Sequence, residues 1–342
     1  MDFGGFGEHG GPGAGDPAPW TAQGRVKAAV DLRRGIIGPA REGRWSEASA
    51  TAADAVAQLR AVAATDPQAA GPELGKSLAL LAGFQATQGR TEHCLQLASE
   101  AAPLLRHGAA ADPGPYLAAL ALDLYYMADA LRRLKRHDEA VGTIAEALAY
   151  LRRPDFRPDP TVAALMQSPE LTENIKELIG YQCRTVLLTV YIARNEPAEA
   201  LATAHDALED AQLPASRVPR RYTVTLAQHL SLLAELYTKR RELQVALGYR
   251  QEALPLWETA IGYARDDLGR DFGNGARYRL AQALRGYAIQ LVTLSRSGEA
   301  LALAREATVH ARTLARSGLF TYQAMFERCQ KTLAALEQRL RK

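Results

Sequence analysis

A small residue recurs along this chain at a nearly constant spacing, and this recurrence constrains the fold more than any other feature. The interval is 46 residues three times, and two longer intervals measure 60 and 54 residues. The positions are Ala48, Cys94, Ala140, Ala200, Ala246 and Ala300. Regular self-similarity of this kind is typical of repeat proteins, in which each unit packs only against its neighbours.

The repeating unit is clearest over residues 121–148. Apolar residues there follow helical spacing in two blocks, one from Leu124 to Leu131 and one from Ala140 to Ala147, with polar residues between them. Twelve residues before the recurring position stands a second small residue in four units: Ala82, Ala128, Ala234 and Ala288. Leu188 and Ile36 take this place in the other two units. Small residues where two helices cross allow a close approach of the backbones, so the unit is predicted to be a helical hairpin. Gly43, Gly89 and Asn195 stand at the turn, where a left-handed backbone is expected.

This pattern resembles the tetratricopeptide repeat, a 34-residue helix-turn-helix with small residues at positions eight, twenty and twenty-seven, here Ala128, Ala140 and Ala147. The longer interval is similar to the extended repeats of kinesin light chains and bacterial signalling regulators, and it implies longer helices, longer loops or both. The resemblance implies an all-α fold, a right-handed α-solenoid of about six such repeats over residues 23–316.

The segments outside this array are also interpreted from their sequence. Residues 1–22 are rich in Gly and Pro and are predicted to be a disordered tail, with a docking motif at Phe3 and Phe6 as the alternative. Residues 317–342 are predicted to form a C-terminal capping helix. Its apolar stripe could instead form a homodimer seam through residues 319–340. The stripe consists of Leu319, Tyr322, Phe326, Cys329, Leu333, Leu336 and Leu340.

Two insertions account for the longer intervals between units. Residues 153–166 contain repeated Arg-Pro-Asp, which excludes regular helix up to Pro160, and Ser168-Pro169-Glu170 restarts the helix. Residues 266–274 are the second insertion, and both are expected to be surface loops. Asp266, Asp267 and Asp271 lack the spacing of a calcium loop.

Composition limits the classes of function. A formal net charge of +3 over 342 residues gives no argument for nucleic acid as a partner. Three widely separated cysteines fit a reducing cytoplasm, and no apolar run is long enough for a membrane span. The phosphate-binding, zinc-protease and serine-hydrolase motifs are absent from the sequence, so no enzyme activity, cofactor or metal is expected.

The resemblance implies that the first helices line a concave groove through their second, fifth, ninth and twelfth positions. The groove residues predicted by register are Tyr125, Asp129, Arg132, Gln182, Thr185, Thr189, Gln228, Ser231, Glu235, Gln282 and Arg285. Gln182, Gln228 and Gln282 share the second position, where an amide can donate to and accept from a peptide backbone. Arg285 is the candidate for a carboxylate contact. The alternative is a solvated polar helix face.

The expected function is a non-catalytic protein- or peptide-binding scaffold or regulator. The main alternative is a ligand-sensing subunit of a bacterial signalling or transcriptional switch whose effector lies on another chain. A carrier or enzyme that uses the groove as a small-molecule pocket is the third possibility.

Overall fold

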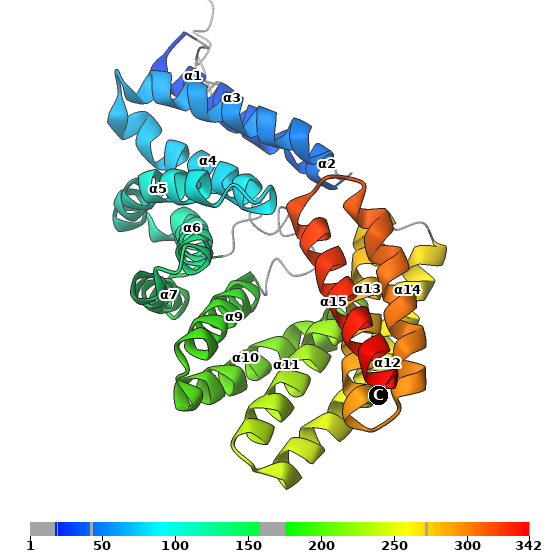
Figure 1. The fold of residues 1–342 in the computed structure, drawn as a ribbon. Coiled ribbons are helices and arrows are strands. Elements are labelled where there is room, and N and C mark those ends of the chain that lie inside the picture. The colour runs from blue at the N-terminus through cyan, green and yellow to red at the C-terminus, as the bar shows by residue number, and fades with distance from the viewer. Residues whose placement is uncertain (1–17, 19, 42–43, 158–174, 271–272, 342) are drawn as a thin grey trace, which may run out of the picture.

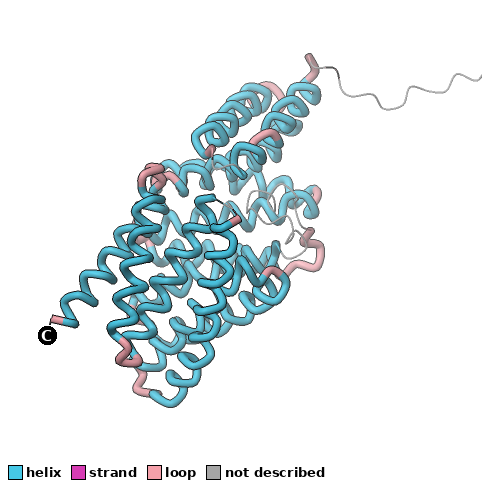
Figure 2. Tube along the Cα trace, turned by 90° about the vertical axis from the view of Figure 1, so that its right-hand side faces the viewer, coloured by secondary structure: helices cyan, strands magenta, loops and turns pink. Residues whose placement is uncertain are grey.

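The computed structural model describes residues 18, 20–41, 44–157, 175–270 and 273–341, and every regular element within these residues is a helix. The predicted tail up to residue 17 and the restart at Ser168-Pro169-Glu170 lie outside the described residues. The helices are α1 (Ala22–Arg34), α2 (Ile37–Arg41), α3 (Trp45–Ala63), α4 (Pro67–Thr87), α5 (Thr91–Ala111), α6 (Pro113–Arg133), α7 (His137–Leu151), α9 (Ile175–Arg194), α10 (Pro197–Arg217), α11 (Pro219–Lys239), α12 (Leu243–Gly269), α13 (Gly273–Thr293), α14 (Ser297–Ala315) and α15 (Phe320–Leu340). Short loops join most of them (Figure 2).

The helices pair as the sequence predicts, and the register is confirmed by burial. The pairs are α1 with α3, α4 with α5, α6 with α7, α9 with α10, α11 with α12 and α13 with α14. Every recurring small residue is at most 1% exposed, as are the residues twelve positions earlier in each unit. The extra length of the repeat lies largely in the helices, since several of them have 21 residues. The chain is therefore an all-α solenoid of extended helix-turn-helix repeats.

The tight turns inside the pairs share one backbone conformation. Gly89, Lys135, Asn195, Arg241 and Ser295 all have a positive φ, between 58° and 76°. In each turn the next residue donates its backbone N–H to a carbonyl five residues back, as Arg90 does to Gln85 and Glu242 does to Tyr237. This is the hydrogen-bond pattern of a Schellman helix end. The prediction for Gly89 and Asn195 is confirmed, whereas Gly43 lies outside the described residues.

The first helices form the inner layer of a curved array. Consecutive first helices contact one another from α1 through α4 and α6 to α9, and again from α11 through α13 to α15, whereas consecutive second helices share no comparable contact. The array consequently bends with its first helices inside, and Figure 1 shows the helices following an arc that brings the start of α15 back towards α4.

One aromatic side chain makes this long-range contact. A Cβ added at Gly89, in the α4–α5 turn, would lie 2.6 Å from Cγ of Phe320 at the start of α15. The guanidinium of Arg133, at the end of α6, lies 5.7 Å from the centre of the Phe320 ring. The last helix therefore contacts the second and third repeats, far away in the sequence.

The C-terminal helix caps the array. Met325, Cys329 and Leu336 are at most 3% exposed against α13 and α14, while Leu340 is 48% exposed. The apolar stripe of α15 thus packs mainly within its own chain. Dimerisation through residues 319–340 stays a prediction.

One of the two insertions differs from expectation. The prediction of a surface loop over residues 266–274 is wrong for its first part, because α12 continues to Gly269. Asp267 is 6% exposed and forms ion pairs with Arg220 of α11 at 3.1 Å and Arg279 of α13 at 2.9 Å. These two pairs extend the helix into the junction between α11 and α13. The first insertion is non-helical as predicted from Arg153 to Arg157, its described part.

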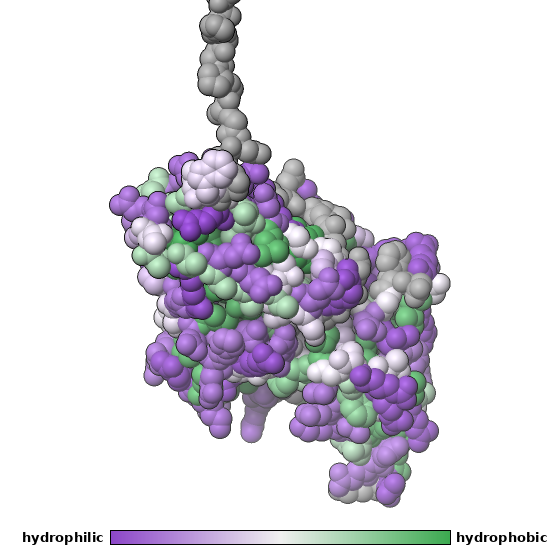
Figure 3. All heavy atoms as spheres, turned by 90° about the horizontal axis from the view of Figure 1, so that it is seen from above, coloured by the Kyte–Doolittle hydropathy of each residue, from purple (hydrophilic) through white to green (hydrophobic). Residues whose placement is uncertain are grey.

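One face of the molecule is mainly polar. On the face seen in Figure 3, hydrophilic side chains cover most of the surface and hydrophobic ones are interspersed in smaller groups. Among the described residues, no helix combines the length and apolar character needed to cross a membrane.

Replacing Ala140 with Leu should lower stability, because Ala140 is fully buried where α7 packs on α6. Overpacking of this kind costs ~1–3 kcal/mol. Thermal unfolding followed by circular dichroism would measure the shift in midpoint. Ala145→Leu on the exposed face of α7 is the matched control and should leave the midpoint close to wild type. Equal midpoints for both variants would contradict the assigned register.

Candidate peptide-binding groove

The predicted groove residues all lie on first helices, namely α6, α9, α11 and α13. Gln182, Gln228 and Gln282 are half-buried, one on each of α9, α11 and α13. Within the described part of the chain, none of the three side-chain amides has a hydrogen-bond partner, and none is sealed from solvent. The inner layer consequently carries three equivalent amides whose donors and acceptors are available to a ligand.

Most of the predicted hydroxyl groups are already used inside the array. Thr185 donates to the backbone carbonyl of Tyr181, and Thr189 donates to that of Val186, each within α9. Ser231 donates to the carbonyl of Ala227 and accepts a 3.0 Å hydrogen bond from the indole N–H of Trp257. These side chains stabilise helices and one helix junction.

The charged groove residues on α6 and α11 are also paired. Asp129 is 9% exposed and accepts from Arg132 and Arg133 at 2.6 and 2.7 Å. Glu235 forms an exposed pair with Lys239 at 3.1 Å. Burial raises the pKa of Tyr125, which packs beside Tyr126 with ring centres 5.1 Å apart. None of these groups presents an uncompensated charge.

Arg285 is half-buried and contacts the capping helix. Its Nε donates to Thr332 Oγ1 at 3.0 Å and to the carbonyl oxygen of Arg328 at 3.3 Å, both on α15. Burial lowers the pKa of Arg285. The Nε of this side chain therefore joins the capping helix to α13. Contact of Arg285 with a ligand carboxylate stays a prediction.

Beside this contact lies a cavity that the sequence did not identify. It has a volume of 440 Å³ and lies between α13 and α15, with Ile289, Val292, Thr293, Lys331, Thr332, Ala335, Leu336 and Arg339 as its lining. Ile289 and Val292 occupy the ninth and twelfth positions of the sixth repeat, which belong to the inner face. The repeat register therefore places Ile289 and Val292 on the inner face. It does not cover the α15 residues of the lining, because α15 lies outside the six repeats.

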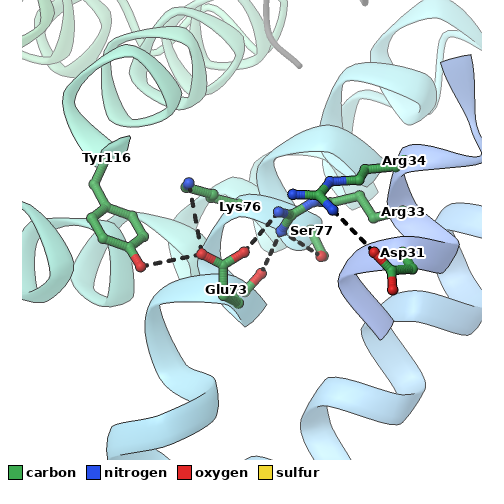
Figure 4. Close-up of polar contacts among 7 residues, drawn as sticks. All are labelled: Asp31, Arg33, Arg34, Glu73, Lys76, Ser77 and Tyr116. Atoms are coloured by element: carbon green, nitrogen blue, oxygen red, sulfur yellow. Dashed lines mark hydrogen bonds and ion pairs between the residues drawn. The ribbon is translucent and has the colours of Figure 1, made fainter. Parts of the chain in front are cut away.

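At the other end of the array, a polar cluster connects three first helices (Figure 4). Glu73 of α4 accepts from Arg33 of α1 at 2.7 Å and from the hydroxyl of Tyr116 of α6 at 3.1 Å. Lys76 lies 3.6 Å from Glu73, and Arg33 also donates to Ser77. Burial acts to raise the pKa of Glu73, but the charges of Arg33 and Lys76 and the hydrogen bonds outweigh it, so the pKa lies below its ordinary value of 4.5. The carboxylate thus joins the first three repeats.

The described residues can be compared with the requirements of a metal site and of a reactive cysteine. They contain no group of three or more His, Cys, Asp or Glu residues that could hold a metal ion. Cys94, Cys183 and Cys329 are buried and unpaired, and burial raises the pKa of the first two thiols to about 12 and of the third to about 11. Burial therefore favours the protonated form of these thiols at neutral pH.

Comparison with known proteins returns similar folds at low sequence identity. No family model matches the chain, and no curated protein sequence matches it. BtubC (BKLC) from P. vanneervenii is 16% identical with a TM-score of 0.49, and the match covers 79% of this chain and 92% of that one. A Rap protein complexed with competence and sporulation factor is 13% identical with a TM-score of 0.46, covering 92% and 78%. The apo form of RapI is 12% identical with a TM-score of 0.47, covering 91% and 99%.

The fold is a tetratricopeptide-like α-solenoid. Its own geometry carries this assignment, through the buried small residues, the shared turn conformation and the inner layer of first helices.

Replacing Glu73 with Gln should destabilise the N-terminal end of the array at neutral pH. Hydrogen bonds to a charged group contribute ~1.5–3 kcal/mol each, and the Glu73 side chain is only 19% exposed. Because the pKa of Glu73 is lowered on folding, its contribution is complete above pH 4.5 and is lost as the pH falls through the folded pKa. Urea unfolding at pH 7 and pH 3.5 should therefore show a smaller difference between variant and wild type at the lower pH.

The matched control for this variant is Glu299→Gln, which removes a fully exposed carboxylate paired with Arg296. It should leave the free energy of unfolding nearly unchanged at both pH values. A Glu73 variant as stable as this control at pH 7 would contradict the structural role of the cluster.

Proposed function

We propose that this chain is a non-catalytic peptide- or protein-binding scaffold that works in the cytoplasm and binds an extended peptide along its inner face. The observation that supports this function is the row of three half-buried, unbonded amides at Gln182, Gln228 and Gln282. Each stands at the second position of a successive first helix.

An extended peptide suits this row because of its own chemistry. Its backbone offers alternating N–H donors and C=O acceptors, and each glutamine amide can both donate and accept. Amide contacts to the backbone are indifferent to the peptide's side chains, so specificity has to come from other positions. Thr185, Thr189 and Ser231 are hydrogen-bonded within their helices, and Asp129 is paired with Arg132, whereas the three glutamine amides are unbonded.

Replacing Gln182, Gln228 and Gln282 together with Ala should weaken ligand binding. Each lost hydrogen bond is expected to cost ~0.5–1.5 kcal/mol, so the triple variant should bind at least about tenfold more weakly. Partners would be captured with wild-type protein and identified by mass spectrometry, and affinities for a partner-derived peptide would then be measured by isothermal titration calorimetry. The control triple variant replaces Gln58, Gln244 and Gln251, which are exposed on second helices. Equal losses in both triple variants would refute the inner face as the binding surface.

The second candidate function is a ligand-sensing subunit whose effector lies on another chain. One observation favours it: Phe320 joins the end of the array to the α4–α5 turn and to Arg133. A contact between distant repeats can be made or broken as a unit. A ligand that binds the closed and open arrays with different affinity would shift this equilibrium.

Replacing Phe320 with Ala should release this contact while leaving the repeats folded. A partly exposed cation–π contact contributes ~0.5–1 kcal/mol, so amide exchange should become about two- to fivefold faster at residues 87–91 and 320–324. Hydrogen–deuterium exchange with mass spectrometry would measure these segments separately. Leu340→Ala, at the exposed end of the same helix, should change neither segment. Unchanged exchange in the Phe320 variant would remove the support for a switch.

A further inference from the structure

We propose that the cavity between α13 and α15 is a recognition pocket for an extended peptide segment with the pattern acidic-x-apolar-x-acidic. This inference rests on the proposed peptide-binding function and names the ligand class that the inner face selects. The pocket takes the apolar side chain, and Lys331 and Arg339 each bind one carboxylate.

The floor of the pocket is apolar and partly open to solvent. Ile289 is 36% exposed on α13, and Val292 and Leu336 lie beside it in the lining. A volume of 440 Å³ accommodates a large aliphatic or aromatic side chain together with adjoining backbone. Burying a Leu or Phe side chain is favourable because its apolar surface leaves water.

The charge around the pocket is positive and uncompensated. Within the described part of the chain, Lys331 and Arg339 make no ion pair or hydrogen bond, and no acidic residue is among the described lining residues. This differs from the outer layer, where exposed arginines such as Arg60 and Arg265 form ion pairs with glutamates of the next repeat. Two unpaired cations beside an apolar cavity favour a ligand with two carboxylates.

The spacing of the cations matches an extended peptide. Lys331 and Arg339 are eight residues apart on α15, a rise of roughly 12 Å at 1.5 Å per residue. Residues i and i+4 of an extended strand are about 13 Å apart, and residues i, i+2 and i+4 point to the same side. Two acidic residues four positions apart can therefore contact both cations while the central residue enters the pocket.

The pocket is held open without a ligand. The hydrogen bonds from Arg285 to Thr332 and to the carbonyl of Arg328 fix the separation of α13 and α15 beside the cavity. Thr332 is itself a lining residue, and its hydroxyl donates to the Arg328 carbonyl. A preformed site avoids the ordering cost that a flexible surface would incur on binding.

The test measures fluorescence polarisation with a labelled Gly-Glu-Ser-Leu-Ser-Glu-Gly peptide, blocked at both ends. Wild-type protein should bind it, and the double variant Lys331→Glu/Arg339→Glu should bind at least about tenfold more weakly. The same variant should regain binding to Gly-Lys-Ser-Leu-Ser-Lys-Gly, which wild type should not bind. Replacing the peptide's Leu with Gly should abolish binding to wild type.

The control double variant Arg25→Glu/Arg316→Glu changes the net charge equally, at exposed positions away from the pocket. It should bind the acidic peptide as wild type does, and circular dichroism should show all variants folded. Equal weakening in both double variants would reduce the effect to net charge and overturn the proposal. Preferred binding of a helical peptide whose acidic residues are eight positions apart would overturn the extended geometry.

Two further outcomes separate this inference from the proposed function. If a partner peptide requires Gln182, Gln228 and Gln282 but is unaffected by the charge reversal, the pocket is refuted while the inner face remains the binding surface. If sedimentation velocity shows a wild-type dimer that Lys331→Glu/Arg339→Glu dissociates, the pocket belongs to a second copy of the chain and the peptide assignment is wrong.

Discussion

The close approach of paired helices at small residues is the constraint on which the rest of this structure depends. Ala128 and Ala140 are both fully buried, and an equivalent pair of buried small residues occurs in four of the six repeats. In these four repeats a larger side chain at either position would separate the two helices, so close packing holds the hairpins in one geometry. Repetition of that geometry generates the curvature, and the curvature places the first helices inside. The inner face is consequently a product of packing, available for whatever side chains its exposed positions carry.

Ion pairs join consecutive second helices, which otherwise pack little against one another. Consecutive second helices share little contact, yet Arg60 pairs with Glu100, Arg106 with Glu146 and Arg265 with Glu306, at 2.5 to 2.8 Å. On the inner side, the carboxylate of Glu73 is only 19% exposed and joins the first helices of three repeats. The exposed pairs each contribute little to stability, so the less exposed Glu73 cluster is the stronger link between repeats.

The sequence predicts the repeats well because small residues at crossings and glycine or asparagine at a turn have direct steric causes. The sequence predicts the site less well. The repeat register assigns each residue to a face of its helix, but it does not tell which side chains of other helices contact that residue. Arg285 stands at an inner position, yet its Nε donates hydrogen bonds to two residues of α15. Lys135, Arg241 and Ser295 adopt a positive φ that their side chains disfavour, because the surrounding hairpin imposes it. Asp267 extends α12 through partners 47 and 12 residues away in sequence, which no local pattern contains.

The capping helix combines three roles that follow from its being one rigid element. Its buried stripe closes the exposed end of the sixth repeat, Phe320 contacts the second and third repeats, and its C-terminal half forms one wall of the cavity. A helix of 21 residues is roughly 30 Å long, so the closing contact and the cavity are well separated but mechanically joined. A ligand that binds more tightly when the Phe320 contact is formed would stabilise that contact, and loss of the contact would lower the affinity for the ligand by the same free energy. If the cavity binds a ligand, α15 is the element through which that binding and the Phe320 contact would be coupled.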